Sequence, residues 1–264
     1  MWGENAWDAF TSGERWMAFA NASGYGVGVV SPFVAHFGAG FFDNGKIGTY
    51  NCVPKGLGPY DSPTGYIAPW GAEIIDPSVP YAYRFALVLG SVAEVRAYAA
   101  AQHAAGADEP LAPAYRFAAR GDRAHAVYND AVDAGLPVGA RGLLMNFTGP
   151  HPQVIGPFTA FAPRDAPRVV VRATYAADAA LAGAVAGLAW TTPGAGTPCG
   201  TCYAAAPVVA DGAAHDYVFD LAAIPSYTAA PTIERIVFAP VGFAGAAPAL
   251  LGRQLVAVES IAAQ

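Results

Sequence analysis

The last third of the chain, residues 169–261, consists of short runs in which apolar and polar residues alternate. Examples are VVVRATY at 169–175, HDYVFDL at 215–221 and IERIVFAP at 233–240. A period of two places successive side chains on opposite faces, which indicates strands and not helices. Several such runs, separated by Gly, Pro and Asp, predict a β-sandwich or jelly roll.

The first part of the chain is also rich in predicted strands, between residues 16 and 89. One helix is predicted from Ser91 to Ala105, because Ser91 and Glu94 have the spacing of a capping box and Gly106 can end the helix. Residues 108–113 (DEPLAP) are predicted to form a linker. We therefore expect an all-β protein with one connecting helix and two domains, residues 1–107 and 114–264.

The amino-acid composition argues against some classes of function. Of the 264 residues, 54 % are hydrophobic and 13 % charged, with a net charge of −6. This is enough apolar material for a core, and an acidic chain without a basic patch is not expected to bind nucleic acid. No apolar run approaches the ~18 residues of a membrane span. Residues 1–10 lack the pattern of a secretory leader, so we expect the leader to be absent here or the chain to be a piece of a longer product.

Two of the three cysteines, Cys199 and Cys202, form the sequence PCGTC in a loop rich in Gly, Pro and Thr. A small disulfide is the favoured interpretation, with free thiols or a metal ligand pair as alternatives. Asn21 and Asn146 each begin an N-glycosylation sequence. Together these features favour an extracellular, secreted setting.

The order of landmarks in the second half resembles the jelly-roll accessory modules of large secreted polysaccharide-degrading enzymes. In that resemblance Trp190 fills the core and Arg235 pairs with a carboxylate such as Asp220. Such modules often hold a structural Ca²⁺ through loop oxygens. The landmarks are Asp133, Gly135, Thr148, Gly149, Pro152, Pro157, Trp190, Asp211, Gly212, Tyr217, Asp220, Leu221, Arg235 and Pro240, and the acidic residues available to a metal are Asp130, Asp133 and Asp211.

The segment GERWMAFANASGYGVGVVSP, residues 13–32, is similar to strand pairs in β-supersandwich domains of the mutarotase-like type. Many carbohydrate hydrolases and lyases have that fold. The resemblance covers about ninety residues and only part of such a sheet. It implies a partial supersandwich in the first domain, and, if the protein is an enzyme, a glycoside hydrolase or polysaccharide lyase.

Acidic residues beside aromatic rings are the first candidates for sugar chemistry, because a glycosidase needs carboxylates and a pyranose stacks on a ring. Glu14 lies near Trp16 and Glu73 near Trp70, and His36 is a candidate base. The alternative for the two glutamates is an ordinary solvent-facing strand position. The alternative for His36 is a core histidine bonded to the backbone.

The segment YDSPTGYIAPW, residues 60–70, is the best candidate for a binding loop. It combines Tyr60, Asp61, Tyr66 and Trp70 with two prolines, which lower the entropy lost on ordering a loop. A packed strand connection is the alternative. The first domain also holds four of the five tryptophans, so we expect the ligand there.

These patterns predict a glycan-associated protein that binds a polysaccharide or oligosaccharide, as a piece of a polysaccharide-degrading enzyme with a carbohydrate-binding-like module. A non-catalytic carbohydrate-binding protein or a structural or adhesion β-sandwich is the alternative. Glu14, Glu73 and His36 carry the catalytic hypothesis. The substrate-binding hypothesis rests on Trp16, Tyr60, Asp61, Tyr66 and Trp70.

Overall fold

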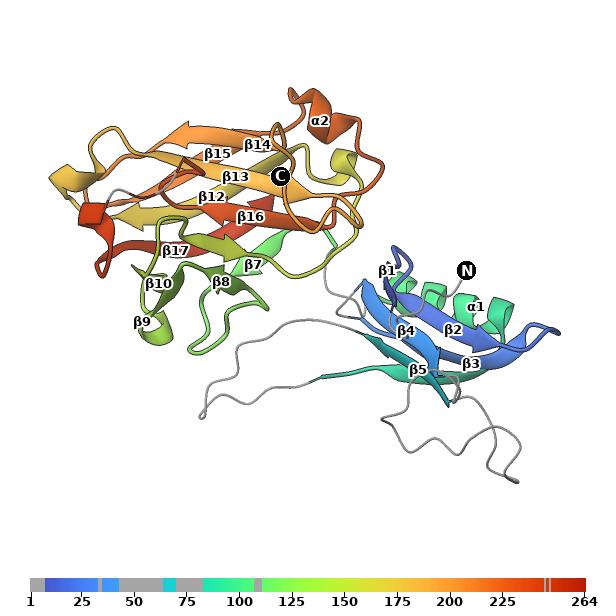
Figure 1. The fold of residues 1–264 in the computed structure, drawn as a ribbon. Coiled ribbons are helices and arrows are strands. Elements are labelled where there is room, and N and C mark those ends of the chain that lie inside the picture. The colour runs from blue at the N-terminus through green and yellow to red at the C-terminus, as the bar shows by residue number, and fades with distance from the viewer. Residues whose placement is uncertain are drawn as a thin grey trace. The chain divides into compact units, whose positions relative to one another are not determined.

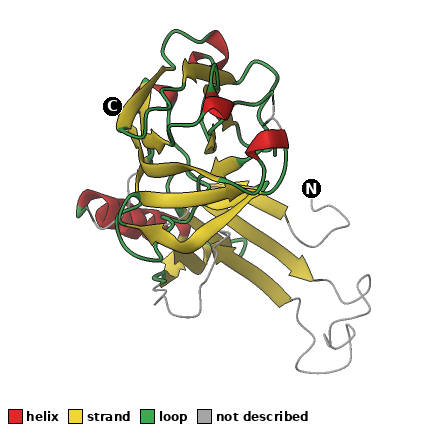
Figure 2. Cartoon of the chain, turned by 90° about the vertical axis from the view of Figure 1, so that its left-hand side faces the viewer, coloured by secondary structure: helices red, strands yellow, loops and turns green. Residues whose placement is uncertain are grey.

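The computed structural model describes residues 8–32, 35–42, 64–69, 83–106, 111–244, 246 and 248–264. Strands make up 45 % of the structure and helical residues 13 %, which confirms the predicted all-β class (Figure 2). The chain divides into two compact units. Among the described residues, unit 1 contains those up to Gly106 and unit 2 those from Leu111 on.

The described residues of unit 1 form two antiparallel three-stranded sheets and one helix (Figure 1). The sheet orders are β1-β4-β5 and β2-β3-β6, and β5 contacts β2 and β3. Whether these sheets are part of a supersandwich stays a prediction. The elements are β1 (Asp8–Thr11), β2 (Trp16–Ala20), β3 (Tyr25–Val30), β4 (His36–Phe42), β5 (Thr64–Pro69), β6 (Ala86–Ser91) and α1 (Val92–Ala104).

Helix α1 begins where the capping residues predict. The Ser91 Oγ accepts a hydrogen bond from the Glu94 backbone N–H at 3.2 Å, and the Ser91 N–H donates to Glu94 Oε2 at 2.7 Å. Val95 and Ala99 turn toward the sheet and are buried. Gly28 of β3 permits this close packing, since a Cβ there would lie 2.3 Å from a methyl carbon of Val95.

Unit 2 is an antiparallel β-sandwich whose two sheets have the orders β15-β12-β17-β10-β9 and β14-β13-β16-β11-β8. Strands β10 to β17 are thus arranged as β15-β12-β17-β10 in one sheet and β14-β13-β16-β11 in the other, which is the order of a jelly roll and confirms that prediction. The elements are β7 (Ala114–Arg116), β8 (Val127–Asn129), β9 (Ala131–Gly139), β10 (Gly142–Phe147), β11 (Gln153–Ile155), β12 (Arg168–Tyr175), β13 (Val185–Thr191), β14 (Tyr203–Pro207), β15 (Ala214–Asp220), α2 (Pro225–Thr228), β16 (Arg235–Ala239) and β17 (Gln254–Ala263), with short 3₁₀ turns at Pro163–Asp165, Ala179–Leu181 and Pro248–Leu250.

The core of unit 2 lies between its sheets. Trp190 is fully buried, as predicted, and its ring meets that of Tyr227 edge to face at 5.0 Å. The expected pairing of Arg235 with Asp220 is wrong. Arg235 instead donates from Nε to the Gly156 carbonyl at 3.0 Å and lies 4.0 Å from the centre of the Phe158 ring. The guanidinium therefore contacts a carbonyl oxygen and the face of an aromatic ring.

Candidate functional site

The structure brings Glu14 and Trp16 together, as the first catalytic hypothesis requires. The Trp16 indole N–H donates to Glu14 Oε2 at 2.7 Å, and Arg96 of α1 forms an ion pair with Oε1. These two hydrogen bonds lower the pKa of Glu14 below its ordinary value. A carboxylate held ionised with both oxygens engaged is poorly suited to donate a proton. The geometry therefore favours a structural ion pair, and the catalytic role of Glu14 stays a prediction.

Trp16 is not an open stacking surface. Its side chain is half-buried and packs against the small cluster formed by Val30, Val95 and Ala99. One face of a ring must be accessible for a sugar to stack on it. The position of Trp16 therefore favours packing between sheet and helix.

His36 lies at the start of β4 and is 8 % exposed. Its Nδ1 is 3.4 Å from the Thr11 hydroxyl, on the neighbouring strand β1. This environment matches the alternative of a core histidine better than that of a solvent-accessible base.

Four further candidates, Glu73, Tyr60, Asp61 and Trp70, lie outside the described residues. Tyr66 is in β5 with its backbone opposite Gly40 of β4. The roles of these residues stay predictions.

The three acidic residues proposed for calcium each have other partners. Asp133 forms an ion pair with buried Arg123 and accepts a hydrogen bond from the Tyr128 hydroxyl at 2.7 Å. Burial and that hydrogen bond raise the pKa of Tyr128. The Asp130 carboxylate accepts from the His151 N–H at 2.9 Å. In unit 2, then, a guanidinium supplies the positive charge beside Asp133.

Asp211 is bound at a different loop, where it accepts from the Ala213 N–H at 2.8 Å and lies 2.9 Å from His215 Nε2. These bonds lower its pKa. Within the described ranges, no group of three or more His, Cys, Asp or Glu residues is placed to hold a metal ion. The calcium prediction therefore gains no support from the described part of the chain.

A small pocket in unit 1 was not predicted. It lies where the chain enters β6 beside the C-terminal half of α1, and its volume is about 150 Å³. Phe85 (54 % exposed) and Tyr98 (39 % exposed) contribute aromatic rings, and Arg84 and Gln102 contribute polar groups. Val30, Pro32 and Ala86 complete the lining.

One sequence signal for this pocket was present. Tyr98 and Gln102 are four residues apart, so they share a face of the predicted helix. That they meet Arg84 and Phe85 depends on how the helix packs on the sheet, which residue spacing does not give.

Unit 2 has a larger hollow on the outer surface of β13 and β14, with a volume of about 370 Å³. Tyr203 and Phe243 contribute rings whose centres are 6.3 Å apart. Phe243 lies against Gly187, where a Cβ would come within 2.7 Å of the ring. The rest of the lining is Val, Ala and Gly, so we call this hollow the apolar trough.

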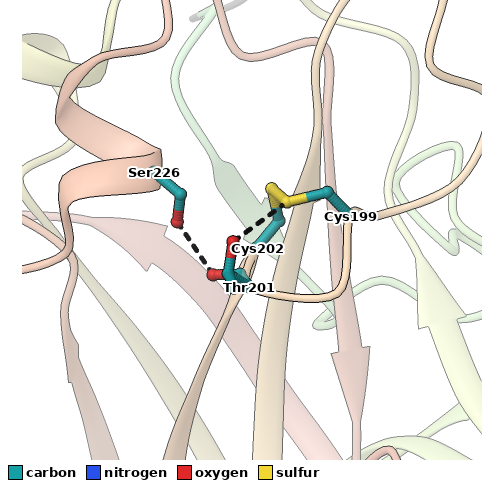
Figure 3. Close-up of a disulfide and its surroundings, with 4 residues drawn as sticks. All are labelled: Cys199, Thr201, Cys202 and Ser226. Atoms are coloured by element: carbon teal, nitrogen blue, oxygen red, sulfur yellow. Dashed lines mark hydrogen bonds between the residues drawn. A yellow bond between two sulfur atoms is a disulfide. The ribbon is translucent and has the colours of Figure 1, made fainter.

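The disulfide between Cys199 and Cys202 is formed, as predicted (Figure 3). No helix in the described part of the chain is both long and apolar enough to span a bilayer. Comparison of the chain with known protein families, curated proteins and solved structures finds no match.

Proposed function

We propose that this protein is a secreted, glycan-associated protein that binds a sugar in the unit 1 pocket. The observation that carries the proposal is the lining of that pocket, where two aromatic rings and two polar side chains meet in about 150 Å³. The sequence resemblance of residues 13–32 and of the second half of the chain to parts of polysaccharide-active enzymes points to the same ligand class.

The chemistry of the lining suits a pyranose. The apolar C–H face of a sugar stacks on an aromatic ring, while its hydroxyls need hydrogen-bond partners. Phe85 and Tyr98 offer rings, and the Gln102 amide and Arg84 guanidinium offer polar groups. The volume is below the ~300–1,000 Å³ of sites for drug-sized ligands, so it fits one sugar unit.

The apolar trough of unit 2 fits a sugar less well. It has rings but is otherwise lined by aliphatic side chains and glycine. Sugar hydroxyls buried there would lose their hydrogen bonds to water without replacement, which disfavours binding. Unit 1 is therefore the proposed site, in the same half of the chain as the sequence-based expectation.

Binding, without turnover, is the activity we propose. A glycosidase needs a carboxylic acid that can donate a proton, with its pKa raised. Glu14 has the opposite shift, and its two oxygens are engaged by Trp16 and Arg96. A binding site needs no such acid.

A glycan array followed by calorimetric titration of the strongest ligand tests the proposal. Tyr98→Ala should weaken binding about tenfold, which corresponds to about 1.4 kcal/mol. The matched control is Tyr203→Ala, which removes an exposed ring from unit 2 and should leave the affinity unchanged. Trp70→Ala tests the predicted loop in the same assay.

Two outcomes would contradict the proposal. An array without any glycan ligand would count against the ligand class. A loss of affinity in Tyr203→Ala but not in Tyr98→Ala would place the sugar in the apolar trough. Release of reducing sugar from a polysaccharide panel would instead support the enzymatic hypothesis.

A further inference from the structure

The Cys199–Cys202 disulfide lies in the loop between β13 and β14 and spans only three positions. A disulfide stabilises a fold mainly by closing a loop in the unfolded chain, and this effect is smallest for short loops. The bond also joins no two distant elements. The disulfide therefore contributes little to the stability of the fold, and the stability of unit 2 does not explain why the two cysteines are paired.

The turn that carries the two cysteines is held without the sulfur atoms. The Cys202 N–H donates to the Cys199 carbonyl at 2.9 Å, and the Trp190 N–H donates to the Cys202 carbonyl at 3.3 Å. The Ser226 hydroxyl of α2 donates to the Thr201 carbonyl at 2.8 Å (Figure 3). The backbone that places the Cα atoms 4.9 Å apart thus has its own support.

The two sulfur-bearing residues differ in exposure. Cys199 is exposed, whereas Cys202 is 7 % exposed and belongs to the core of unit 2. Gly200 beside Cys199 has open space where a Cβ would lie. An incoming thiolate therefore has access to Cys199. The Thr201 hydroxyl, 3.5 Å from Cys199 Sγ, is placed to hydrogen-bond a thiolate there.

We propose that this pair is a reversible thiol-exchange site for a small thiol such as glutathione, with Cys199 as the sulfur that is attacked. The thiolate forms a bond to Cys199 Sγ, and the Cys199–Cys202 bond breaks to release Cys202 as a thiolate, which takes a proton from water. A second thiolate then attacks the small-molecule sulfur and releases Cys199. Two thiols become one disulfide, and the two electrons reduce the protein pair.

Reversibility follows from the preserved turn. Because the hydrogen bonds to its backbone carbonyls do not involve sulfur, the two thiols stay at bonding separation after reduction. Groups held in position react as if present at high concentration. Re-oxidation by oxidised glutathione should therefore be fast and return the same disulfide.

The first test uses the full chain with Cys52→Ser, so that thiol counts report this pair alone. After incubation with reduced glutathione or dithiothreitol without denaturant, alkylation and mass spectrometry should find two modified cysteines. Hydrogen exchange in 185–207 and 225–228 should change little. The proposal is overturned if no thiol appears until denaturant is added, or if reduction exposes the core of unit 2.

The second test assigns the attacked sulfur. With oxidised glutathione, Cys202→Ser should trap a mixed disulfide at Cys199 at least about tenfold faster than Cys199→Ser traps one at Cys202, since exchange depends on access. Equal rates would refute the assignment. If Cys202→Ser does not fold, the test uses Ser226→Ala, which loosens the turn and should slow re-oxidation but not reduction. An unchanged re-oxidation rate there would contradict the preserved-turn argument.

Discussion

The two units bury their apolar residues in different ways. In unit 2, two sheets enclose a continuous core with Trp190, Tyr227 and Phe238 at its centre. In unit 1, helix α1 covers one face of the β2-β3-β6 sheet through a cluster of Val30, Val95 and Ala99, and Phe37 and Ala39 of the β1-β4-β5 sheet are also buried. Area removed from water is the main source of stability. Under the proposed function, unit 2 supplies the larger enclosed core and unit 1 the ligand pocket.

Edge strand β6 of unit 1 has apolar side chains that are exposed, unlike those in the enclosed core of unit 2. Its side chains alternate, and Leu87 and Leu89 are 65 % and 77 % exposed. The inward residue Val88 packs with α1 against the small cluster. Exposed apolar side chains side by side on one strand face can mark a binding or docking region, and on unit 2 the apolar trough is lined by exposed Tyr203 and Val185.

The largest effect should come from the core of unit 2. Trp190→Ala should lower the free energy of unfolding by roughly 3–5 kcal/mol, because it leaves a large cavity beside Tyr227. Differential scanning calorimetry, combined with hydrogen exchange to assign the transition, measures it. Trp190→Phe keeps a ring and removes an indole N–H that has no partner in the described structure. It should therefore lower the free energy of unfolding by less than Trp190→Ala does. A loss below about 1 kcal/mol for Trp190→Ala would contradict the enclosed core.

A buried and an exposed ion pair within unit 2 test how much burial contributes to stability. Asp133→Asn in unit 2 should lower stability by about 3 kcal/mol, because it leaves the buried Arg123 guanidinium without its carboxylate. The value is at the low end of the range since Asp133 is 17 % exposed. Urea unfolding measures it, and Asp216→Asn, at an exposed ion pair with Arg172 in the same unit, is the control. If Asp133→Asn and Asp216→Asn lower the free energy of unfolding by the same small amount, burial of an ion pair does not determine its contribution to stability.

A third prediction concerns close packing by glycine. Gly28→Ala in unit 1 should cost about 2 kcal/mol, because the new methyl group meets Val95 at 2.3 Å and pushes α1 away from β3. Gly187→Ala in unit 2 should cost less, since the atom it meets belongs to the Phe243 ring, which can move outward. Hydrogen exchange measured along α1 distinguishes the two variants, because only Gly28→Ala should lower the protection of this helix. Protection of α1 that survives Gly28→Ala would disprove this packing argument.

The sequence was informative where a local pattern determines the outcome. Alternation predicted the strands of the jelly roll, Ser91 and Glu94 predicted the helix start, and the spacing of Cys199 and Cys202 predicted a small disulfide. Each signal depends on residues close together in the chain. The burial of Trp190 followed from the resemblance.

What failed or was missed depends on contacts between distant segments. Arg235 was assigned to a carboxylate, yet Gly156, which follows β11 beside β16, offered a carbonyl instead. The unit 1 pocket needs Arg84 and Gln102 to meet across the junction of strand and helix. The rings of Tyr203 and Phe243 likewise come from the start of β14 and from the segment that follows β16. Periodicity shows which residues share a face of a strand or helix, but it does not show which faces pack against each other.

The smallest predicted effect is at the exposed ion pair of unit 1. Glu14→Gln should lower stability by less than ~1 kcal/mol, because Arg96 and Glu14 are 66 % and 47 % exposed and water screens their attraction. The pH dependence has a definite sign. The pKa of Glu14 is lowered from 4.5, so its contribution is present above about pH 4.5 and is lost as the pH falls through the lower folded-state pKa.

Melting curves of wild type and Glu14→Gln between neutral pH and pH 3 test this sign. The two should differ slightly near pH 7 and converge as acid protonates Glu14 in the wild type. Asp133→Asn supplies the comparison at a buried pair, where the difference from wild type at neutral pH should be several times larger. If Glu14→Gln lowers stability as much as Asp133→Asn at neutral pH, the Glu14 carboxylate contributes more to the fold than an exposed ion pair does.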